Sequence, residues 1–449
     1  MKTLTFPCLL VLFLASSCLP DLPRNRGESS NLPKEVSSSK AAIVRTLVSG
    51  VDNEIALQTI PNALCEISAA DNAGTSRVFS DDRGVVGFSL RPIMTEASEL
   101  TVTCQDDTGS RVSDVIALRI GAADSEEIRQ EAAERSVLEG LSHPGAIVLP
   151  SLTAETASSL TDDDLRSAGY PPRFGTDQTS PQYRRWLEIV GKPITVLSSQ
   201  LLDNPGVSHA AASSCHVNTS SYWSGLVLDA TAVTYGYVYG RFNVPTVTPQ
   251  AGFNNKHALA FWVGLDGCGS NDVVQDGSWE DTVTQGKVQT STYHTWVEYY
   301  PAPEKVVSLP IKPGNDLEVW SWVSDATGHT GSAMNIASGG GYGWYYLYNA
   351  TTSKASGWIK IKKPNPSVPF KGNTAEWIME RPNESAGITT LANYGTATMT
   401  SMSAIDTKGV SHTYLTDPYQ IFTMVDGANV LSTMSIDSGN LDFTWHLYQ

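Results

Sequence analysis

Residues 374–382 read Thr-Ala-Glu-Trp-Ile-Met-Glu-Arg-Pro, and this stretch sets two carboxylates inside a segment that is otherwise typical of a buried strand. Successive side chains of an extended segment point to opposite faces. One face of this strand is therefore apolar, whereas Glu376 and Glu380 lie on the other. A carboxylate occupies a position where a strand usually carries an apolar or neutral residue.

Two earlier segments, 261–266 and 293–300, repeat this two-faced pattern. In 261–266, Phe, Val and Leu alternate with polar or aromatic positions, which predicts one core-facing side. The residues on the opposite faces of the two segments include Trp262, Asp266, His294, Trp296, Glu298 and Tyr300. The three segments together indicate a sheet with one ordinary core face and one face of carboxylates and aromatics, as is typical of a groove.

The chain has 449 residues, of which 41% are hydrophobic and 17% are charged, so it can bury a large core and more than one domain. Its net charge of −16 argues against nucleic acids and anionic membrane surfaces as partners, because both are negatively charged. After the N-terminal region, no apolar run approaches the ~20 residues that a membrane-spanning helix needs.

Residues 1–18 are typical of an export signal, since Lys2 precedes the apolar run 9–14 and three small residues follow it. Cys18 comes directly after these small residues and also resembles a bacterial lipoprotein site, so lipidation is an alternative to simple cleavage. The Ser-rich segment 19–40 would serve as a linker in either case. We expect a secreted or cell-surface protein, with an outer-membrane lipid anchor if Cys18 is modified.

Beyond the signal region the chain contains four cysteines, which allow three disulfide connectivities. Their places in separate parts of the chain favour Cys65–Cys104 and Cys215–Cys268, and an exported protein can keep both pairs oxidised. The sequence has no Cys-x-x-Cys spacing and its eight His are scattered. We therefore expect no metal site and no cofactor.

Residues 41–120 alternate short apolar runs with Asn, Asp and Gly turn residues, at intervals of ~10–20 residues. This pattern predicts an immunoglobulin-like β-sandwich pinned by the Cys65–Cys104 disulfide. No catalytic pattern occurs here, so we interpret it as an accessory module.

Residues 121–200 change to helical signals, with helix starts at Ser125, at Thr161 and at Ser180, which Pro181 follows. The segment separates two β regions, which favours a pro-segment or a strap. Its twelve acidic and seven basic residues rule out attraction of an acidic domain by net charge. Inhibition by this segment would need its shape, or apolar contacts such as those of Trp186.

From Ser220 to Gln449 the pattern is β throughout, with more than ten candidate strands and no long helix. Such a pattern predicts a double-sheet β-sandwich. We therefore predict a mostly β protein, in which this sandwich follows the immunoglobulin-like module and the short helical segment.

Six motifs in this C-terminal region carry a family resemblance. They are Trp223-Ser224-Gly225, Trp262-Val263-Gly264-Leu265-Asp266-Gly267, Val274-Gln275-Asp276-Gly277, Trp296-Val297-Glu298-Tyr299-Tyr300-Pro301, Ala375-Glu376-Trp377-Ile378 and Ala392-Asn393-Tyr394-Gly395. Their order resembles that of the eqolisins, the glutamic peptidases, in a bacterial-type member covering about residues 215–449. The resemblance implies a lectin-like jelly-roll sandwich with its active groove on the concave sheet. It also implies protein or peptide substrates.

The resemblance implies that Glu376 is the catalytic glutamate and Gln275 the catalytic glutamine. The chemistry is consistent, because a Glu of ordinary pKa ~4.3 stays partly ionised in acid and can take a proton from the attacking water. It could then pass that proton to the leaving amine. The oxyanion needs a donor that does not titrate, and a Gln amide is neutral at any working pH. No covalent intermediate and no metal is required.

Other residues match family positions that line the groove and would orient the catalytic pair or contact substrate. These are Trp262, Asp266, Trp296, Glu298 and Tyr300. His294 departs from the family strand, which has Asp there. This departure puts in doubt a carboxylate network at that position and could raise the working pH.

Two other functions compete with a secreted, monomeric acid endopeptidase. Glu298 and Glu376 among aromatics also fit a glycoside hydrolase, in which Gln275 would be dispensable. The aromatics alone would fit a non-catalytic carbohydrate-binding, lectin-like protein. A third pattern, Asp107-Thr108-Gly109 with Asp437-Ser438-Gly439, mimics the paired signature of pepsin-like peptidases. The first copy lies in the accessory module, which argues against it.

Overall fold

The computed structural model describes residues 43–69, 75–92, 98–173, 177–204, 207–209, 217–229, 232–250, 256–286, 288–328, 330, 341–384 and 387–447. The expected signal, the linker, Cys18 and Cys215 lie outside these ranges. Among the described residues, no helix is long and apolar enough to cross a membrane.

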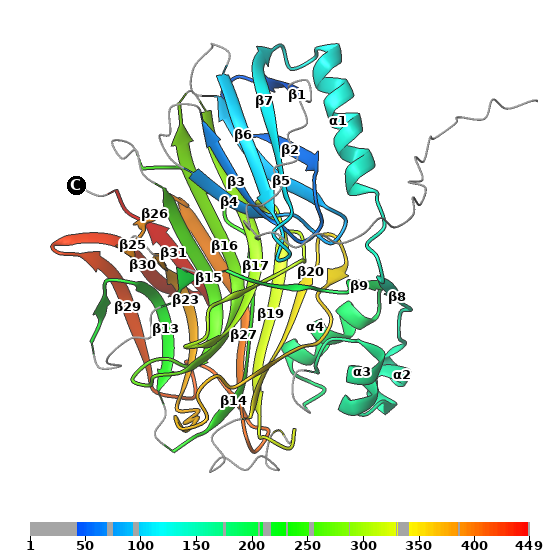
Figure 1. Cartoon of the computed structure of the whole chain (residues 1–449). Coiled ribbons are helices and arrows are strands. Elements are labelled where there is room, and N and C mark those ends of the chain that lie inside the picture. The colour runs from blue at the N-terminus through cyan, green and yellow to red at the C-terminus, as the bar shows by residue number, and fades with distance from the viewer. Residues whose placement is uncertain are drawn as a thin grey trace, which may run out of the picture. The chain divides into compact units, whose positions relative to one another are not determined.

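The N-terminal module is a β-sandwich with its own core (Figure 1). Its strands are β1 (Ile43–Val48), β2 (Asn53–Gln58), β3 (Leu64–Ala69), β4 (Thr75–Phe79), β5 (Val85–Pro92), β6 (Ser98–Gln105) and β7 (Arg111–Gly121). One sheet has the order β1-β7-β6-β3-β4, and β2 pairs with β5. Alternate residues such as Ile67, Phe88 and Val102 meet in the core, as the period-two pattern predicts.

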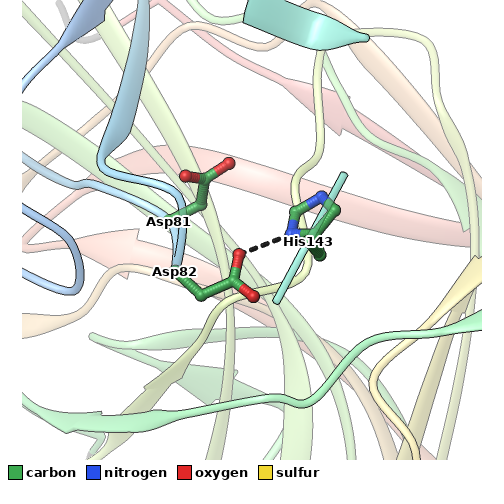
Figure 2. A group of neighbouring side chains, drawn as sticks. All are labelled: Asp81, Asp82 and His143. Atoms are coloured by element: carbon green, nitrogen blue, oxygen red, sulfur yellow. Dashed lines mark hydrogen bonds and ion pairs between the residues drawn. The ribbon is translucent and has the colours of Figure 1, made fainter. Parts of the chain in front are cut away.

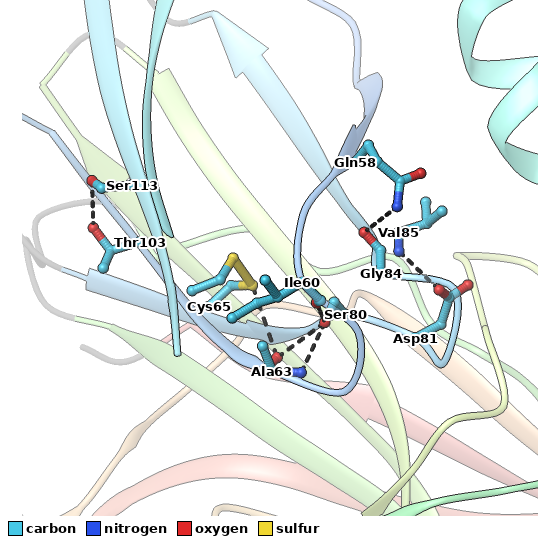
Figure 3. Close-up of a disulfide and its surroundings, with 11 residues drawn as sticks. Gln58, Ile60, Ala63, Cys65, Ser80, Asp81, Gly84, Val85, Thr103 and Ser113 are labelled. Carbon is cyan, nitrogen blue, oxygen red and sulfur yellow. Dashed lines mark hydrogen bonds between the residues drawn. A yellow bond between two sulfur atoms is a disulfide. The ribbon is translucent and has the colours of Figure 1, made fainter. Parts of the chain in front are cut away.

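The predicted Cys65–Cys104 disulfide is confirmed, but it lies within one sheet (Figure 3). The two cysteines are directly opposite each other on the neighbouring strands β3 and β6. The bond therefore joins adjacent strands and does not pin one sheet to the other. Cys268 is also disulfide-bonded.

The helical segment contains α1 (Glu126–Glu139), α2 (Ala154–Ser159), α3 (Asp162–Ala168) and α4 (Pro181–Val190), with short strands β8 (Ile147–Leu149) and β9 (Ile194–Val196). Ser125, Thr161 and Ser180 cap α1, α3 and α4 as predicted, because each side-chain oxygen accepts a backbone N–H of the first turn. Helix α2 was not predicted.

The C-terminal region folds into two packed sheets. The first sheet contains β10 (Leu201–Asp203), β13 (Trp223–Asp229), β15 (His257–Asp266), β16 (Val273–Gln285), β17 (Val288–Tyr300), β18 (Lys305–Val307), β23 (Thr374–Glu380) and β26 (Thr390–Leu391). The second contains β12 (Thr219–Ser220), β14 (Tyr235–Asn243), β19 (Asp316–Ser324), β20 (Tyr342–Asn349), β21 (Lys354–Ala355), β22 (Ile359–Lys362), β27 (Thr396–Asp406), β28 (Ser411–His412), β29 (Tyr419–Asp426), β30 (Asn429–Asp437) and β31 (Asn440–Trp445).

A large apolar core fills the space between these sheets. Phe261, Val263 and Trp377 from the first sheet pack with Val319 and Leu347 from the second. The predicted fold class, a mostly β chain ending in a double-sheet sandwich, is confirmed.

Helices α2, α3 and α4 cover the outer face of the second sheet, on the side away from the carboxylate-bearing strands, whereas α1 packs against the N-terminal module (Figure 1). Trp186 of α4 is fully buried against aromatic residues such as Trp320 and Tyr346. This position suits a strap that stabilises the sandwich, since α2, α3 and α4 lie one whole sandwich thickness from Glu376.

The N-terminal module is joined to the first sheet through backbone pairing. Strand β5 pairs antiparallel with the start of β17, Ser89 opposite Ser291, and β18 pairs with the other half of β17. Two side-chain bonds reinforce the junction: Gln285 Nε2 donates to the Ile67 carbonyl at 2.6 Å, and Thr292 Oγ1 to that of Arg77 at 2.8 Å. The module thus extends the sheet that carries the candidate site. A further small sheet contains β11 (Val207–Ser208), β24 (Asn383–Glu384) and β25 (Gly387–Ile388).

Candidate active site

The two candidate catalytic residues lie on either side of a glycine in one row across the first sheet. Gly264 of β15 is the register partner of Gln275 on β16 and of Glu376 on β23. Glu298 of β17 extends the row beyond Gln275. Since residues opposite each other in a sheet project from the same face, Gln275 and Glu376 flank a position that has no side chain. The strand order therefore assembles the pair from segments 100 residues apart in sequence.

Glu376 is buried, and its two carboxylate oxygens have different surroundings. Oε1 accepts the Cys268 backbone N–H at 2.9 Å and the Thr374 hydroxyl at 3.0 Å. Oε2 has no hydrogen-bond partner among the described residues. Burial raises the pKa of Glu376 well above its usual value; the two donors oppose this, while the charges of Asp266 and Glu380 add to it.

Gln275 is buried beside Glu298, and its Nε2 donates to Glu298 Oε2. Gln275 Oε1 and Glu298 Oε1 have no partner within the part of the chain that the structure describes. Burial raises the pKa of Glu298 to about 8, so this group is a neutral acid at acid pH. Two neutral groups thus form the Gln275 end of the row.

The tryptophans occupy the next row of the same face. Trp262 and Trp296 are the register partners of Gly277 on either side, and both are fully buried. Trp262 Nε1 donates to Glu380 Oε2 at 2.7 Å, and the Trp296 ring stacks on His209 with ring centroids 4.0 Å apart. Trp262 and Trp296, which were predicted to line a groove, therefore lie on the same face as the candidate pair Gln275 and Glu376.

A buried charge network lies beyond the tryptophans. His209 donates from Nε2 to Glu304 at 2.9 Å and from Nδ1 to Glu380 at 3.0 Å. Burial disfavours the charged imidazole, but Glu380 and Glu304 outweigh it and raise the pKa of His209 well above its usual value. Burial likewise opposes ionisation of Glu304, but bonds from His209 and His294 hold its pKa at about 2. His294 Nε2 lies 3.3 Å from Glu304 Oε1.

Asp266 and Tyr300 lie at the ends of their strands in the row next to Gln275, since both are register partners of Val273. Asp266 ends β15, where its carboxylate accepts the Lys371 and Asn373 backbone N–H groups at 2.8 and 3.2 Å. It fixes the chain that enters β23, and no direct bond joins it to Gln275 or Glu376 among the described contacts. Burial and the charge of Asp272 raise the pKa of Asp266 to about 7. Tyr300 is half-buried at the end of β17, opposite Val273.

This face of the sheet is covered, so the predicted groove is closed in this structure. The segment after β10 lies over it, since Val207 packs in the same apolar cluster as Trp262 and Ile378. His209 stacks on Trp296 and is itself 1% exposed. Val207 and His209 form what we call the covering segment, which lies over the tryptophan row of this face.

Sequence reasoning missed His209, Glu304 and Thr374. His209 and Glu304 come from irregular segments that have no period-two pattern, so no sequence signal marked them. Thr374 lies two residues before Glu376 in the segment 374–382. Because residues two apart in a strand share a face, the sequence could have placed Thr374 beside Glu376.

Asp81, Asp82 and His143 group three metal-ligating side chains outside this site (Figure 2), with ligand atoms within 4.8 Å of one another. The residues do not fit a cation well, because Arg83 Nε already donates to Asp81 Oδ2 at 2.7 Å and brings a positive charge to the cluster. His143 Nδ1 lies 2.5 Å from Asp82 Oδ1. The group forms a clasp between the N-terminal module and the chain after α1.

The fold and the site define a β-sandwich hydrolase with a Glu and a Gln on the outer face of its first sheet. The family model described as the Peptidase A4 family matches residues 221–445, half of the chain, and the chain belongs to this family. The resemblance to eqolisins is thereby confirmed, and the protein is a glutamic-type endopeptidase.

Two solved structures are similar to the chain. The first is scytalido-glutamic peptidase with a transition state analog inhibitor, with 21% identity over 51% of this chain and 99% of that one, at a TM-score of 0.40. The second is aspergilloglutamic peptidase from Aspergillus niger, with 20% identity over 42% of this chain and 99% of that one, at a TM-score of 0.33. A comparison with curated proteins gave no significant match.

Proposed function

We propose that the protein is an exported acid endopeptidase in which Glu376 activates water and Gln275 stabilises the oxyanion. Glu376 Oε2 takes a proton from water as the water oxygen attacks the scissile carbonyl carbon. The C–N bond then breaks as Glu376 returns the proton to the leaving amine. Gln275 Nε2 donates to the carbonyl oxygen as it gains negative charge.

The observation that carries this proposal is the shared partner Gly264. It brings no side chain of its own between Gln275 and Glu376, so the donor and the base share one face of the sheet, with the Trp262 ring packed against the glycine. A side chain at Gly264 would not fit, because its Cβ would lie 2.9 Å from the Trp262 ring. Family membership supports the same chemistry.

The glycoside hydrolase alternative fits this geometry poorly. Glu298 and Glu376 are separated by three strand spacings of ~4.8 Å, about 14 Å at the backbone. A glycosidase needs its two carboxyl groups to flank one glycosidic bond, whereas Gln275 and Gly264 stand between these two glutamates in the row. The pepsin-like pair is also dispersed: Asp107 is exposed in a turn of the N-terminal module, and Asp437 is exposed at the end of β30 in the C-terminal sandwich.

The pH dependence follows from Glu376, which must be ionised to act as a base. Its raised pKa puts the acid limb of activity above the ~4.3 of an ordinary Glu. We therefore expect a weakly acid optimum once the covering segment has moved, with export supported by the sequence of residues 1–18.

The deciding experiment measures hydrolysis of casein and denatured globin from pH 2 to 8 by the full chain after acid treatment. We expect activity that resists pepstatin and EDTA, and that falls roughly 10²–10⁴-fold in Glu376→Gln and 10²–10³-fold in Gln275→Ala. Full activity in either variant would refute the site. Growth-medium and membrane fractions of the producing cell, with and without Cys18→Ala, test export and lipidation.

A further inference from the structure

The two oxygens of Glu376 are prepared for different tasks. Oε1 holds two hydrogen bonds, from Cys268 and Thr374, whereas Oε2 has no partner among the described residues. Space beside Oε2 is kept open by Gly267, because a Cβ there would lie 3.1 Å from Oε2 and the residue has φ +105°. Oε1 is therefore held by hydrogen bonds, whereas Oε2 is available to bind a water.

Both donors to Oε1 have rigid supports. Thr374 is fully buried on the same strand and the same face as Glu376, and Asp266 holds the backbone just before it. Cys268 is disulfide-bonded and lies in a tight turn, where the Gly267 N–H donates to Ser270 Oγ at 2.8 Å. Neither donor can turn away without disturbing these contacts.

We infer that Thr374 is a positioning residue for Glu376: with the Cys268 N–H it saturates Oε1 and so assigns Oε2 as the atom that exchanges a proton with water. The inference rests on the proposed function. A hydroxyl that donates a hydrogen bond to a carboxylate stabilises its ionised form and fixes the rotation of the carboxylate group. Losing it should weaken the base in both respects.

The Thr374 hydroxyl matters for the pKa of Glu376 because other groups nearby raise that pKa. Asp266 at the end of β15 and Glu380 on β23 both raise the pKa of Glu376, in addition to burial. Glu298, three strands away in the row, is neutral below its pKa of about 8. Thr374 and Cys268 are the groups that lower the Glu376 pKa, and only Thr374 does so through a side chain.

The test compares Thr374→Val, which keeps the shape and removes the hydroxyl, with Thr374→Ser, which keeps the hydroxyl. In Thr374→Val we expect kcat to fall about tenfold or more with KM unchanged, and the acid limb of kcat/KM to move up by about one pH unit. Thr374→Ser should restore both to within about twofold of wild type. Thr374→Ala removes the same donor if the valine variant is insoluble.

Thr295→Val is the matched control. Thr295 is also a fully buried strand threonine, but its hydroxyl donates to the Val307 and Leu309 carbonyls, both at 3.1 Å. It should lose stability without moving the pH limb. An unmoved limb in Thr374→Val, or a serine variant as impaired as the valine one, would overturn the inference while inactivity of Glu376→Gln still supported the proposed function. Full activity of Glu376→Gln would instead refute the proposed function itself.

Discussion

Gln275 and Glu376 face each other across the backbone of Gly264, which is the register partner of both. The Trp262 ring of the same strand packs against this glycine, 2.9 Å from where a Cβ would lie. Donor and base are held two strand spacings apart, about 10 Å at the backbone, on one rigid sheet.

Gly264→Ala should reduce activity more than stability. The added Cβ would lie 2.9 Å from the Trp262 ring and 3.3 Å from Gln275 Cβ, so both side chains must shift. We expect kcat/KM to fall about 10- to 100-fold, as is usual when catalytic groups are displaced by about 1 Å. Gly236→Ala is the control, because its Cβ would meet only a Thr407 side-chain methyl at 3.6 Å. Equal activity in the two variants would contradict the importance of this position.

Glu298→Gln should hardly change peptidase activity at acid pH. Burial raises the pKa of Glu298 to about 8, so the residue is neutral at pH 4–6 and an amide is a close replacement. Activity there should stay within roughly threefold of wild type, whereas Glu298→Ala should lose about tenfold because Gln275 loses its neighbour. Initial rates at pH 5 decide this. Complete inactivity of Glu298→Gln would revive the glycosidase interpretation, and assays on polysaccharides would follow.

Stability should decrease as pH rises from about 4 to 7. Burial raises the pKa of Asp276 and Glu280 well above their usual values, so the folded protein keeps protons that the unfolded chain releases near pH 4. The stability they contribute is complete below that pH and is lost as pH rises toward the folded pKa. Urea midpoints at pH 4 and 7 measure it. Asp276→Asn removes the titrating group, so the urea midpoints at pH 4 and 7 should lie closer together. The asparagine oxygen can still accept the Ser321 hydroxyl. A wild-type midpoint that increases toward pH 7 would count against the assignment.

His209→Ala should destabilise the protein most between about pH 4.5 and 6.5. The raised pKa of His209 gives stability that is complete below ~6.5 and is lost at higher pH. The pKa of Glu304, about 2, gives stability that is complete above ~4.5 and is lost on acidification toward pH 2. Removing the shared partner should cost about 3 kcal/mol within that window, measured as the change in Tm at pH 5.5.

The same variant tests the covering segment. Because His209 stacks on Trp296 over the candidate site, its loss should shorten the lag before hydrolysis begins after acid treatment. His446→Ala is the control, since the one hydrogen bond described for the His446 side chain is with Thr433, near the C-terminus. An unchanged lag in His209→Ala would show that the segment is not what limits access.

Local structure could be predicted from the sequence where it depends on the residues of a single helix or strand. The caps at Ser125, Thr161 and Ser180 were predictable because a helix start depends on a few adjacent residues. The two faces of 374–380 were predictable because strand geometry has a period of two. The motifs that place Gln275 and Glu376 in a family also depend only on the order of short segments.

The sequence by itself thus determined the fold class, the Cys65–Cys104 pair and the candidate base and oxyanion donor. Only the tertiary structure decided that β15 lies between β16 and β23, which sets Gly264 between those two residues. It also decided that helices α2, α3 and α4 cover the opposite sheet and that His209 covers the tryptophan row. Apart from the β15–β16 hairpin, the pairing and packing join segments more than 100 residues apart, such as Gly264 with Glu376 and His209 with Glu380. The free energy of such contacts depends on the whole assembled core, and no local pattern records it.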